Sequence, residues 1–513
     1  MSQPSNNAKK LTLVPLILMI FTSVFGFTNM PRAFYLMGYA AIPWYILSAA
    51  LFFIPYAFMM AEYGSSFKKE SGGMYSWMEK SVGPKYAFIG TFMWYASYII
   101  WMVSVSSSLW IPLSNAIFGS DMTQSWSLFG LTSVQTLGIL GMVWIAIVTF
   151  VSTKGVDKIS KVTSVGGTAV ALLNIVLLGG GMLVVLLKGE LAQPITNIAQ
   201  SFTQSPSPNY QSGVSILSFL TFAVFAFGGL EVLGGLVDQT ENAEKTFPKG
   251  LAISAIVISL GYALGIFACG MFTNWNDILG VETVNMGNAA YVLMSNLGYQ
   301  VGLGFGLSEA ACLSMGAWTA RFVGLSMFLS LTGAFFTLTY SPLKTLIQGA
   351  PKELWPGKLG DLKNGMPVNA MKVQAIIVIA MIAMVSFGGS SADEFFTILT
   401  LMTNVAMTIT YMFLSAAFPA FKKKQLNGEI EKSYVVYKTK TSAIIAAVIV
   451  TAIVGFANVF TIIEPVLTSP DGLKKTLTMI GGPLAFALTG FILFTVYENK
   501  HGKKANKSEK AVG

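Results

Sequence analysis

Long apolar runs separated by short polar segments make up most of the chain. An α-helix needs about 20 predominantly apolar residues to cross the hydrocarbon core of a bilayer, so each uncharged run of that length predicts one membrane-spanning helix. The runs between successive ionisable residues predict twelve helices, at 11–37, 40–61, 86–113, 131–152, 162–187, 213–237, 251–273, 317–342, 373–389, 395–420, 442–463 and 476–497. The uncharged run 283–308 contains three asparagines, one glutamine and five glycines. We expect it to form a helical loop outside the membrane.

Basic residues are concentrated in alternate loops between these helices. With a cytoplasmic N-terminus, 27 of the 32 lysines and arginines fall in cytoplasmic segments, and the others are Arg32, Lys188, Arg321, Lys474 and Lys475. Positive residues collect in short cytoplasmic loops, so both termini are predicted to be cytoplasmic. Counting 283–308 as a span would move the lysines of 344–372 outside. The net charge of +9 therefore indicates topology and contact with anionic lipid headgroups, and no nucleic-acid partner is expected.

Composition supports an all-α integral membrane protein and excludes several kinds of chemistry. Hydrophobic residues make up 54% of the 513 residues and charged residues 11%, against about 25% in soluble domains. The mean hydropathy is +0.64. The only histidine is His501 in a basic tail, and Cys269 and Cys312 lie 43 residues apart in no metal-binding spacing. We expect no metal, no cofactor and no enzyme active site. The first apolar run is too long for a cleavable signal peptide.

Two predicted helices contain interruptions. The first includes Ser23-Val24-Phe25-Gly26-Phe27-Thr28-Asn29-Met30-Pro31, and the sixth includes Phe225-Ala226-Phe227-Gly228-Gly229-Leu230-Glu231. A helix that breaks within lipid does so where its free backbone groups line a cavity or contact protein. Each break alone is also explained by a glycine contact between helices. Because the two breaks are five helices apart, an odd number, a repeated unit of five would enter the membrane from opposite faces, as in secondary transporters.

Glu231 follows the second break directly. A carboxylate in the membrane interior costs at least about 2.5–3.5 kcal/mol on insertion scales, so it is functional by default. The alternative is a structural carboxylate that accepts hydrogen bonds from unwound backbone. Five other carboxylates lie at predicted helix ends or in loops, and we expect solvated caps and rim charges there: Glu62, Glu79, Asp121, Asp238 and Asp393.

Aromatic residues mark the third predicted helix and the sixth. Trp94, Tyr98 and Trp101 share one helical face. Such a stripe can bind an ammonium group by cation–π attraction, or it can simply fill space between helices. Phe225 and Phe227 flank the second break and are candidate gates.

Several motifs resemble the amino acid, polyamine and organocation (APC) transporter superfamily, in particular its branch of glutamate/GABA-type antiporters. They run in the expected order over about residues 11–420: Ala61-Glu62, Gly72-Gly73-Met74-Tyr75-Ser76-Trp77, Gly83-Pro84, the segment 225–231, Glu241-Asn242-Ala243-Glu244 through Pro248, Pro342-Leu343-Lys344, Leu354-Trp355-Pro356 and Gly365-Met366-Pro367-Val368. Jointly these motifs are specific. The whole chain also resembles a set of bacterial inner-membrane members of that branch.

The resemblance implies a LeuT-like fold of twelve helices, with a 5+5 inverted repeat and discontinuous helices 1 and 6. It implies that a substrate carboxylate binds at Val24, Phe25 and Gly26 and its amine at Phe225, Ala226 and Gly229. This chain departs from the family in three ways. One glycine remains of the Gly-Ser-Gly at the first break, Ala334 aligns with a carboxylate of the glutamate/GABA antiporters, and 162–187 contains no lysine.

The predicted organisation is a cytoplasmic N-terminus at 1–10, a transport core at 11–421, a cytoplasmic loop at 422–441, two further helices at 442–497 and a basic cytoplasmic tail at 498–513. The repeats cover about 11–187 and 213–420. We expect a multi-pass inner-membrane carrier that exchanges a small amino acid or primary amine. Proton-coupled uptake is the alternative mode, with protons as a second partner, and a channel is a distant alternative. The sequence predicts no oligomeric state.

Overall fold

Membrane-length helices form most of the computed structural model, which describes residues 10–509. The helices of the first half are α1 Leu13–Val24, α2 Asn29–Met37, α3 Ala41–Ser48, α4 Ile54–Ser66, α5 Gly73–Ser81, α6 Pro84–Ser108, α7 Trp110–Phe118, α8 Ser133–Ser152, α9 Val156–Lys188 and α10 Ile198–Thr203. Those of the second half are α11 Gly213–Phe225, the 3₁₀ helix η5 Leu230–Gln239, α12 Ala243–Phe272, α13 Ala289–Gly304, α14 Glu309–Gly349, α15 Val368–Phe387, α16 Gly389–Leu426, α17 Lys440–Thr468 and α18 Gly472–Glu509.

Eleven helical segments within residues 10–509 are long and apolar enough to cross a membrane. Together they overlap all twelve predicted ranges, and the first two ranges share the segment Leu13–Ser66. This segment has 54 residues, or about 80 Å at 1.5 Å per residue, whereas the hydrocarbon core is about 30 Å thick. The all-helical membrane fold is thus confirmed, with eleven candidate segments in place of twelve.

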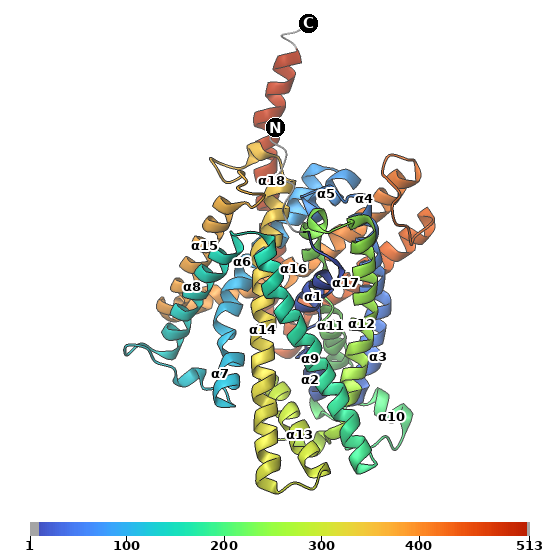
Figure 1. Ribbon diagram of the computed structural model, residues 1–513. Coiled ribbons are helices and arrows are strands. Elements are labelled where there is room, and N and C mark those ends of the chain that lie inside the picture. The colour runs from blue at the N-terminus through green and yellow to red at the C-terminus, as the bar shows by residue number, and fades with distance from the viewer. Residues whose placement is uncertain (1–9, 510–513) are drawn as a thin grey trace.

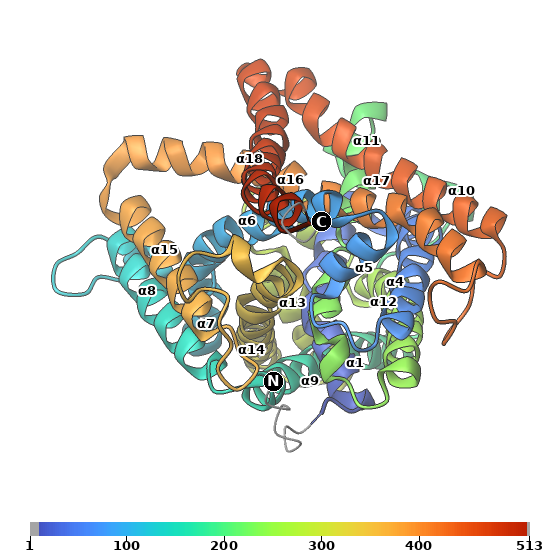
Figure 2. The same cartoon turned by 90° about the horizontal axis from the view of Figure 1, so that it is seen from above.

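The loops separate into two ends of the bundle. In Figure 1, α4, α5 and the end of α18 lie at one end, whereas α7, α10 and α13 lie at the other. The predicted helical loop at 283–308 contains α13, which has 16 residues and is not among the membrane-length segments. α13 lies against α14, whose 41 residues run through most of the height of the bundle. Viewed along the bundle, α8 and α15 form one edge, and α17 and α18 lie together at another (Figure 2).

Large apolar side chains remain exposed along the outer faces of these helices. Ile175 on α9 is 65% exposed, Leu260 on α12 is 58% exposed and Val459 on α17 is 55% exposed. A water-soluble protein rarely exposes contiguous apolar surface on this scale. These faces therefore fit a lipid environment, in which apolar side chains are solvated by acyl chains.

Candidate functional site

The first break separates α1 from α2 over residues 25–28. The Phe25 amide still donates to the Phe21 carbonyl, and the Gly26 amide turns back onto the Val24 carbonyl at 3.0 Å. Pro31 is the third residue of α2, where its missing N–H removes no helical hydrogen bond. Gly26 is exposed, whereas Val24 and Phe25 are buried. The predicted interruption is therefore present, and it leaves backbone groups free for other partners.

The second break separates α11 from η5 over residues 226–229 and touches the first. Gly229 has φ +111°, and a Cβ atom there would lie 2.3 Å from the Ser23 carbonyl oxygen. Only glycine accommodates both this backbone conformation and this approach. η5 then continues as a ten-residue 3₁₀ helix, which is unusually long, since such runs rarely exceed three or four residues. The two interruptions, predicted separately, form one site.

Tyr262 of α12 joins the two breaks through its hydroxyl. This group accepts hydrogen bonds from the Gly26 amide at 3.0 Å and from Asn29 Nδ2 at 3.1 Å. Its single hydrogen faces the carbonyl oxygens of Val24 at 2.9 Å and Ala226 at 3.0 Å. One tyrosine thus satisfies backbone groups from both interrupted helices, as a broken helix in lipid requires.

Glu231 lies at the start of η5 and is fully buried. Its Oε1 accepts hydrogen bonds from Tyr98 Oη at 3.1 Å, Trp94 Nε1 at 3.2 Å and Tyr411 Oη at 3.4 Å. Tyr411, on α16, also accepts a hydrogen bond from the Gly229 amide at 3.0 Å. Oε2 is buried without a hydrogen-bond partner. The carboxylate therefore has donors on one oxygen and an unsatisfied second oxygen.

Aromatic rings from several helices surround this pair of breaks. Phe227 stacks on Phe53 at 4.8 Å between ring centroids and meets the Tyr262 ring edge to face at 5.0 Å. Phe53 belongs to a π-helical turn, Ala49–Phe53, that joins α3 to α4. Phe225 is only partly buried. Of the two candidate gate residues, Phe225 ends α11 directly before the second break and is less enclosed, whereas Phe227 lies within the break and is packed inside.

The structure brings together most of the predicted site residues. Those at the two breaks, together with Trp94, Tyr98 and Glu231, form one group. Trp101 lies further along α6, with its ring 5.3 Å from that of Phe335 on α14. Sequence reasoning missed Tyr262 and Tyr411. A signal for them exists, because a buried tyrosine hydroxyl in an apolar helix needs a hydrogen-bond partner.

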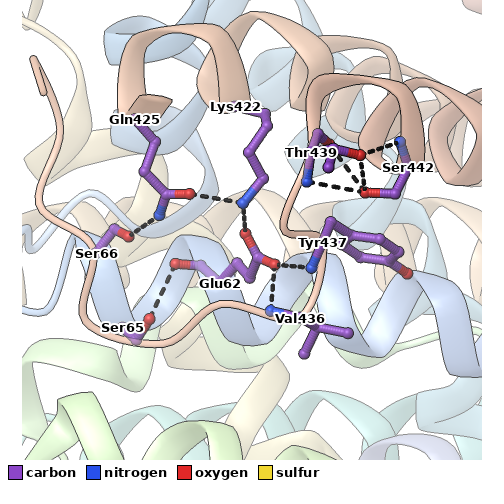
Figure 3. A network of polar contacts seen from close by, with 9 residues as sticks. All are labelled: Glu62, Ser65, Ser66, Lys422, Gln425, Val436, Tyr437, Thr439 and Ser442. Atoms are coloured by element: carbon purple, nitrogen blue, oxygen red, sulfur yellow. Dashed lines mark hydrogen bonds and ion pairs between the residues drawn. The ribbon is translucent and has the colours of Figure 1, made fainter. Parts of the chain in front are cut away.

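The prediction that Glu62 is a solvated rim charge is wrong. Its side chain is 0% exposed, and Oε2 lies 2.5 Å from Nζ of Lys422, which is equally buried on α16. Oε1 accepts the backbone amides of Val436 at 2.7 Å and Tyr437 at 2.6 Å, as Figure 3 shows. Lys422 also donates to Gln425 Oε1 at 2.6 Å. The segment between α16 and α17 thus covers a carboxylate that the sequence assigned to the surface.

Asp238 lies at a helix end and is partly exposed, as expected, but it is paired with a buried lysine. Its Oδ1 lies 2.5 Å from Nζ of Lys344, whose side chain is 1% exposed, and the same ammonium donates to the Gly235 carbonyl at 2.8 Å. This ion pair attaches the end of η5 to α14. Asp121 behaves as expected, since it caps Thr123 in an exposed turn. Glu79 is partly exposed, and the side chain of Asp393 lies outside the described residues.

Discontinuous helices that meet within the membrane are found at the substrate sites of secondary transporters. The chain belongs to the amino acid permease family, which matches residues 11–486. This membership confirms the resemblance drawn from the motifs and makes the protein a transporter of that family, not an enzyme.

Individual relatives are similar over most of their length. The inner membrane transporter YjeM of Salmonella typhimurium is 53% identical over 97% of this chain and 98% of its own. The aspartate/glutamate permease AcaP of Lactococcus lactis subsp. cremoris is 25% identical over 86% of this chain and 85% of its own. The glutamate/gamma-aminobutyrate antiporter of Lactococcus lactis subsp. lactis is 20% identical over 90% of this chain and 85% of its own.

Proposed function

We propose that this protein is an alternating-access carrier that binds a small amino acid or primary amine between its two broken helices. The observation that carries the proposal is the approach of Gly229 to the Ser23 carbonyl beside Glu231, because it brings the unwound backbone of both helices and a buried carboxylate into one place. Half-helix ends of this kind recognise charged substrate groups through their dipoles and unpaired backbone groups.

The proposed topology divides Leu13–Ser66 into two spans. α1 and α2 form helix 1, and α3 through α4 form helix 2, with the turn at Gly38, where φ is +57°. This division makes twelve spans, of which helices 1–5 and 6–10 are inverted repeats. The lysine-rich loops favour cytoplasmic termini. We place the chain in the inner membrane, as the name of its relative YjeM states for that protein.

The proposed contacts follow from the chemistry of the two breaks. The substrate carboxylate faces the amides of Val24, Phe25 and Gly26, and the amine faces the backbone of Phe225, Ala226 and Gly229 together with Glu231. The unpartnered Oε2 of Glu231 favours a cationic group or a proton at this position. Trp94, Tyr98 and Trp101 form the aromatic side, and Phe225 and Phe227 act as gates.

A small zwitterion or amine fits better than a dicarboxylic acid. AcaP is described as an aspartate/glutamate permease, and the antiporter relative as exchanging glutamate and γ-aminobutyrate. Ala334 is a buried alanine on α14 at the position aligned with an additional carboxylate of those antiporters. Exchange is the favoured mode, proton-coupled uptake the second and a channel the third.

Transport by the purified protein in proteoliposomes tests this function. Uptake of a radiolabelled panel of amino acids and small amines should saturate and should accelerate when the same compound is present on the opposite side. Saturable uptake without trans acceleration, but driven by a pH gradient, would replace exchange by proton coupling. Non-saturable flux of every compound would refute a carrier. A preference for glutamate over all small zwitterions would refute the argument from Ala334.

A further inference from the structure

The hydroxyl of Tyr262 has no remaining hydrogen-bonding capacity. A phenol oxygen offers one hydrogen and two acceptor positions. The hydrogen is shared between the carbonyls of Val24 and Ala226, and the acceptor positions are taken by Gly26 and Asn29. The four partners lie at 2.9–3.1 Å, and three of them are backbone groups of the two breaks.

The ring that carries this hydroxyl is held in place from several sides. Phe25 from the first break and Phe227 from the second each lie 5.0 Å from it, and Tyr45 of α3 lies at 5.2 Å. A Cβ atom at Gly261, the preceding residue, would lie 2.5 Å from the Phe25 ring, so α12 approaches the first break as closely as its backbone allows. Tyr262 is therefore seated between the breaks by shape as well as by hydrogen bonds.

We propose that the Tyr262 hydroxyl occupies the place of the substrate's polar head when the site is empty, and that substrate binds by displacing it. The inference rests on the proposed function, since it takes the two breaks as the substrate site. The hydroxyl pairs with the Gly26 amide, which is assigned to a carboxylate, and with the Ala226 carbonyl, which is assigned to an amine. It thus imitates both halves of a zwitterion with a single group.

The hydrogen bonds that a substrate must take over from the Tyr262 hydroxyl define the class of substrate that binds. A group that replaces the hydroxyl must accept hydrogen bonds from Gly26 and Asn29 and donate to Val24 and Ala226. An α-amino acid does both, because its carboxylate accepts and its ammonium donates. A primary amine without a carboxylate donates only, and it offers Gly26 and Asn29 no acceptor in place of the hydroxyl, which costs affinity. The donors that Tyr262 occupies, the Gly26 amide and Asn29 Nδ2, therefore make the site select amino acids over their decarboxylated amines.

The displacement can be tested without a substrate. In a variant carrying Cys269→Ser and Cys312→Ser, a reporter cysteine at Ser23 measures how often the two breaks separate, because the backbone carbonyl of this residue lies against Gly229. Tyr262→Phe should increase the rate of maleimide labelling about fivefold, as expected for the loss of hydrogen bonds that hold the breaks together. Tyr75→Phe is the matched control, since it removes a buried hydroxyl that has no hydrogen-bond partner.

An unchanged labelling rate in folded Tyr262→Phe would overturn the inference. If that variant does not elute as a folded protein in size-exclusion chromatography, Asn29→Leu replaces it. Asn29→Leu removes one donor from the hydroxyl and should increase labelling by a smaller factor. Equal labelling rates for Asn29→Leu and the parent would likewise overturn the inference.

Transport of L-alanine and ethylamine tests selection. In the parent protein, ethylamine should inhibit L-alanine uptake at least about tenfold less well than unlabelled L-alanine does. Tyr262→Phe should lower the KM for L-alanine and the inhibition constant of ethylamine by similar factors, because both displace the same hydroxyl. A raised KM would instead make Tyr262 a direct substrate contact and refute displacement. Absence of L-alanine uptake in all variants would count against the proposed substrate class, and the labelling result would still decide the role of Tyr262.

Discussion

Two carboxylates are fully buried among the described residues, and their surroundings differ in one decisive respect. Glu62 faces an ammonium at 2.5 Å and two backbone amides, so both of its oxygens are satisfied and its charge is neutralised. Glu231 has three neutral donors on one oxygen, none on the other, and no ion-pair partner in the described part of the chain.

We propose that this difference separates a structural carboxylate, Glu62, from a functional one, Glu231. A buried charge with a complete set of partners holds elements together, and removal of one partner leaves the other charge buried and unpaired. A buried charge with an incomplete set is costly unless a ligand, a proton or a conformational change completes it. Glu62 fits the first description and fastens the segment between α16 and α17 to α4. Glu231 fits the second.

Removal of the ammonium from the Glu62 pair should have the largest effect. Lys422→Ala leaves Glu62 buried without its counter-ion, and we expect a loss of about 3–5 kcal/mol of stability. Unfolding of the purified protein in denaturant, monitored by circular dichroism, measures this loss. Lys423→Ala is the control, because Lys423 is the exposed neighbour on the same turn. Recovery of stability in the double variant Glu62→Gln, Lys422→Met would assign the loss to the unpaired charge. Equal stability of Lys422→Ala and Lys423→Ala would contradict the structural role of Glu62.

Glu231→Gln should show the opposite profile. The substitution preserves shape and an acceptor oxygen while removing the charge, so stability should be unchanged or slightly higher. Transport should fall about tenfold or more, or its pH dependence should change, because the charge itself is used. Uptake into proteoliposomes across a pH series measures both. Wild-type kinetics and an unchanged pH profile would reduce Glu231 to a structural carboxylate, the alternative that its position in the sequence leaves open.

Glu62 and Glu231 also show which features of a membrane protein can be predicted from its sequence. The breaks were predictable because each combines glycine with polar or charged residues within a few positions of an otherwise apolar run. The burial of Glu231 was predictable because ionisable residues are rare within membrane helices. The surroundings of Glu62 were not, because its partner Lys422 lies 360 residues away and the helix α4 continues to Ser66, beyond the predicted end at 61.

Tertiary contacts account for the other differences. Lys344 and Lys422 were both counted as cytoplasmic loop charges, yet each is buried in an ion pair. A count of basic residues cannot tell a loop lysine from one covered by another segment. Tyr262 and Tyr411 were missed because an isolated tyrosine in an apolar run is unremarkable until its hydroxyl is placed opposite a broken helix.

The donors to Glu231 provide a finer test. Trp94→Phe removes the indole N–H at 3.2 Å from Oε1 but keeps an aromatic ring, so transport should fall about threefold through loss of one hydrogen bond to the carboxylate. Trp101→Phe is the comparison variant from the same face of α6, a second residue of the proposed aromatic side whose ring packs against Phe335. Initial rates of uptake compare the two variants. An equal or larger effect at Trp101 would indicate that the aromatic stripe acts through shape alone.

The smallest effect is expected at the exposed ion pair on the segment that Glu62 fastens. Lys68 lies 2.8 Å from Glu431 and 2.5 Å from Glu244, and both carboxylates are exposed. Hydrogen bonding to Lys68 lowers the pKa of Glu431, so this contribution to stability is complete above the ordinary carboxyl pKa and is lost only as the pH falls through the lowered value. Between pH 5 and pH 8 this contribution to stability should therefore be constant, and because solvent and salt screen exposed charges, it should be weak.

We expect Lys68→Gln to lower the Tm by about 1 °C at low salt, and this difference should vanish in molar salt. The loss caused by Lys422→Ala should persist in molar salt because its charges are buried. Thermal unfolding of both variants at two salt concentrations makes the comparison. If both losses vanished in salt, Glu62 and Lys422 would be accessible to ions. Glu62 would then not be a buried structural carboxylate, and its contrast with Glu231 would be lost.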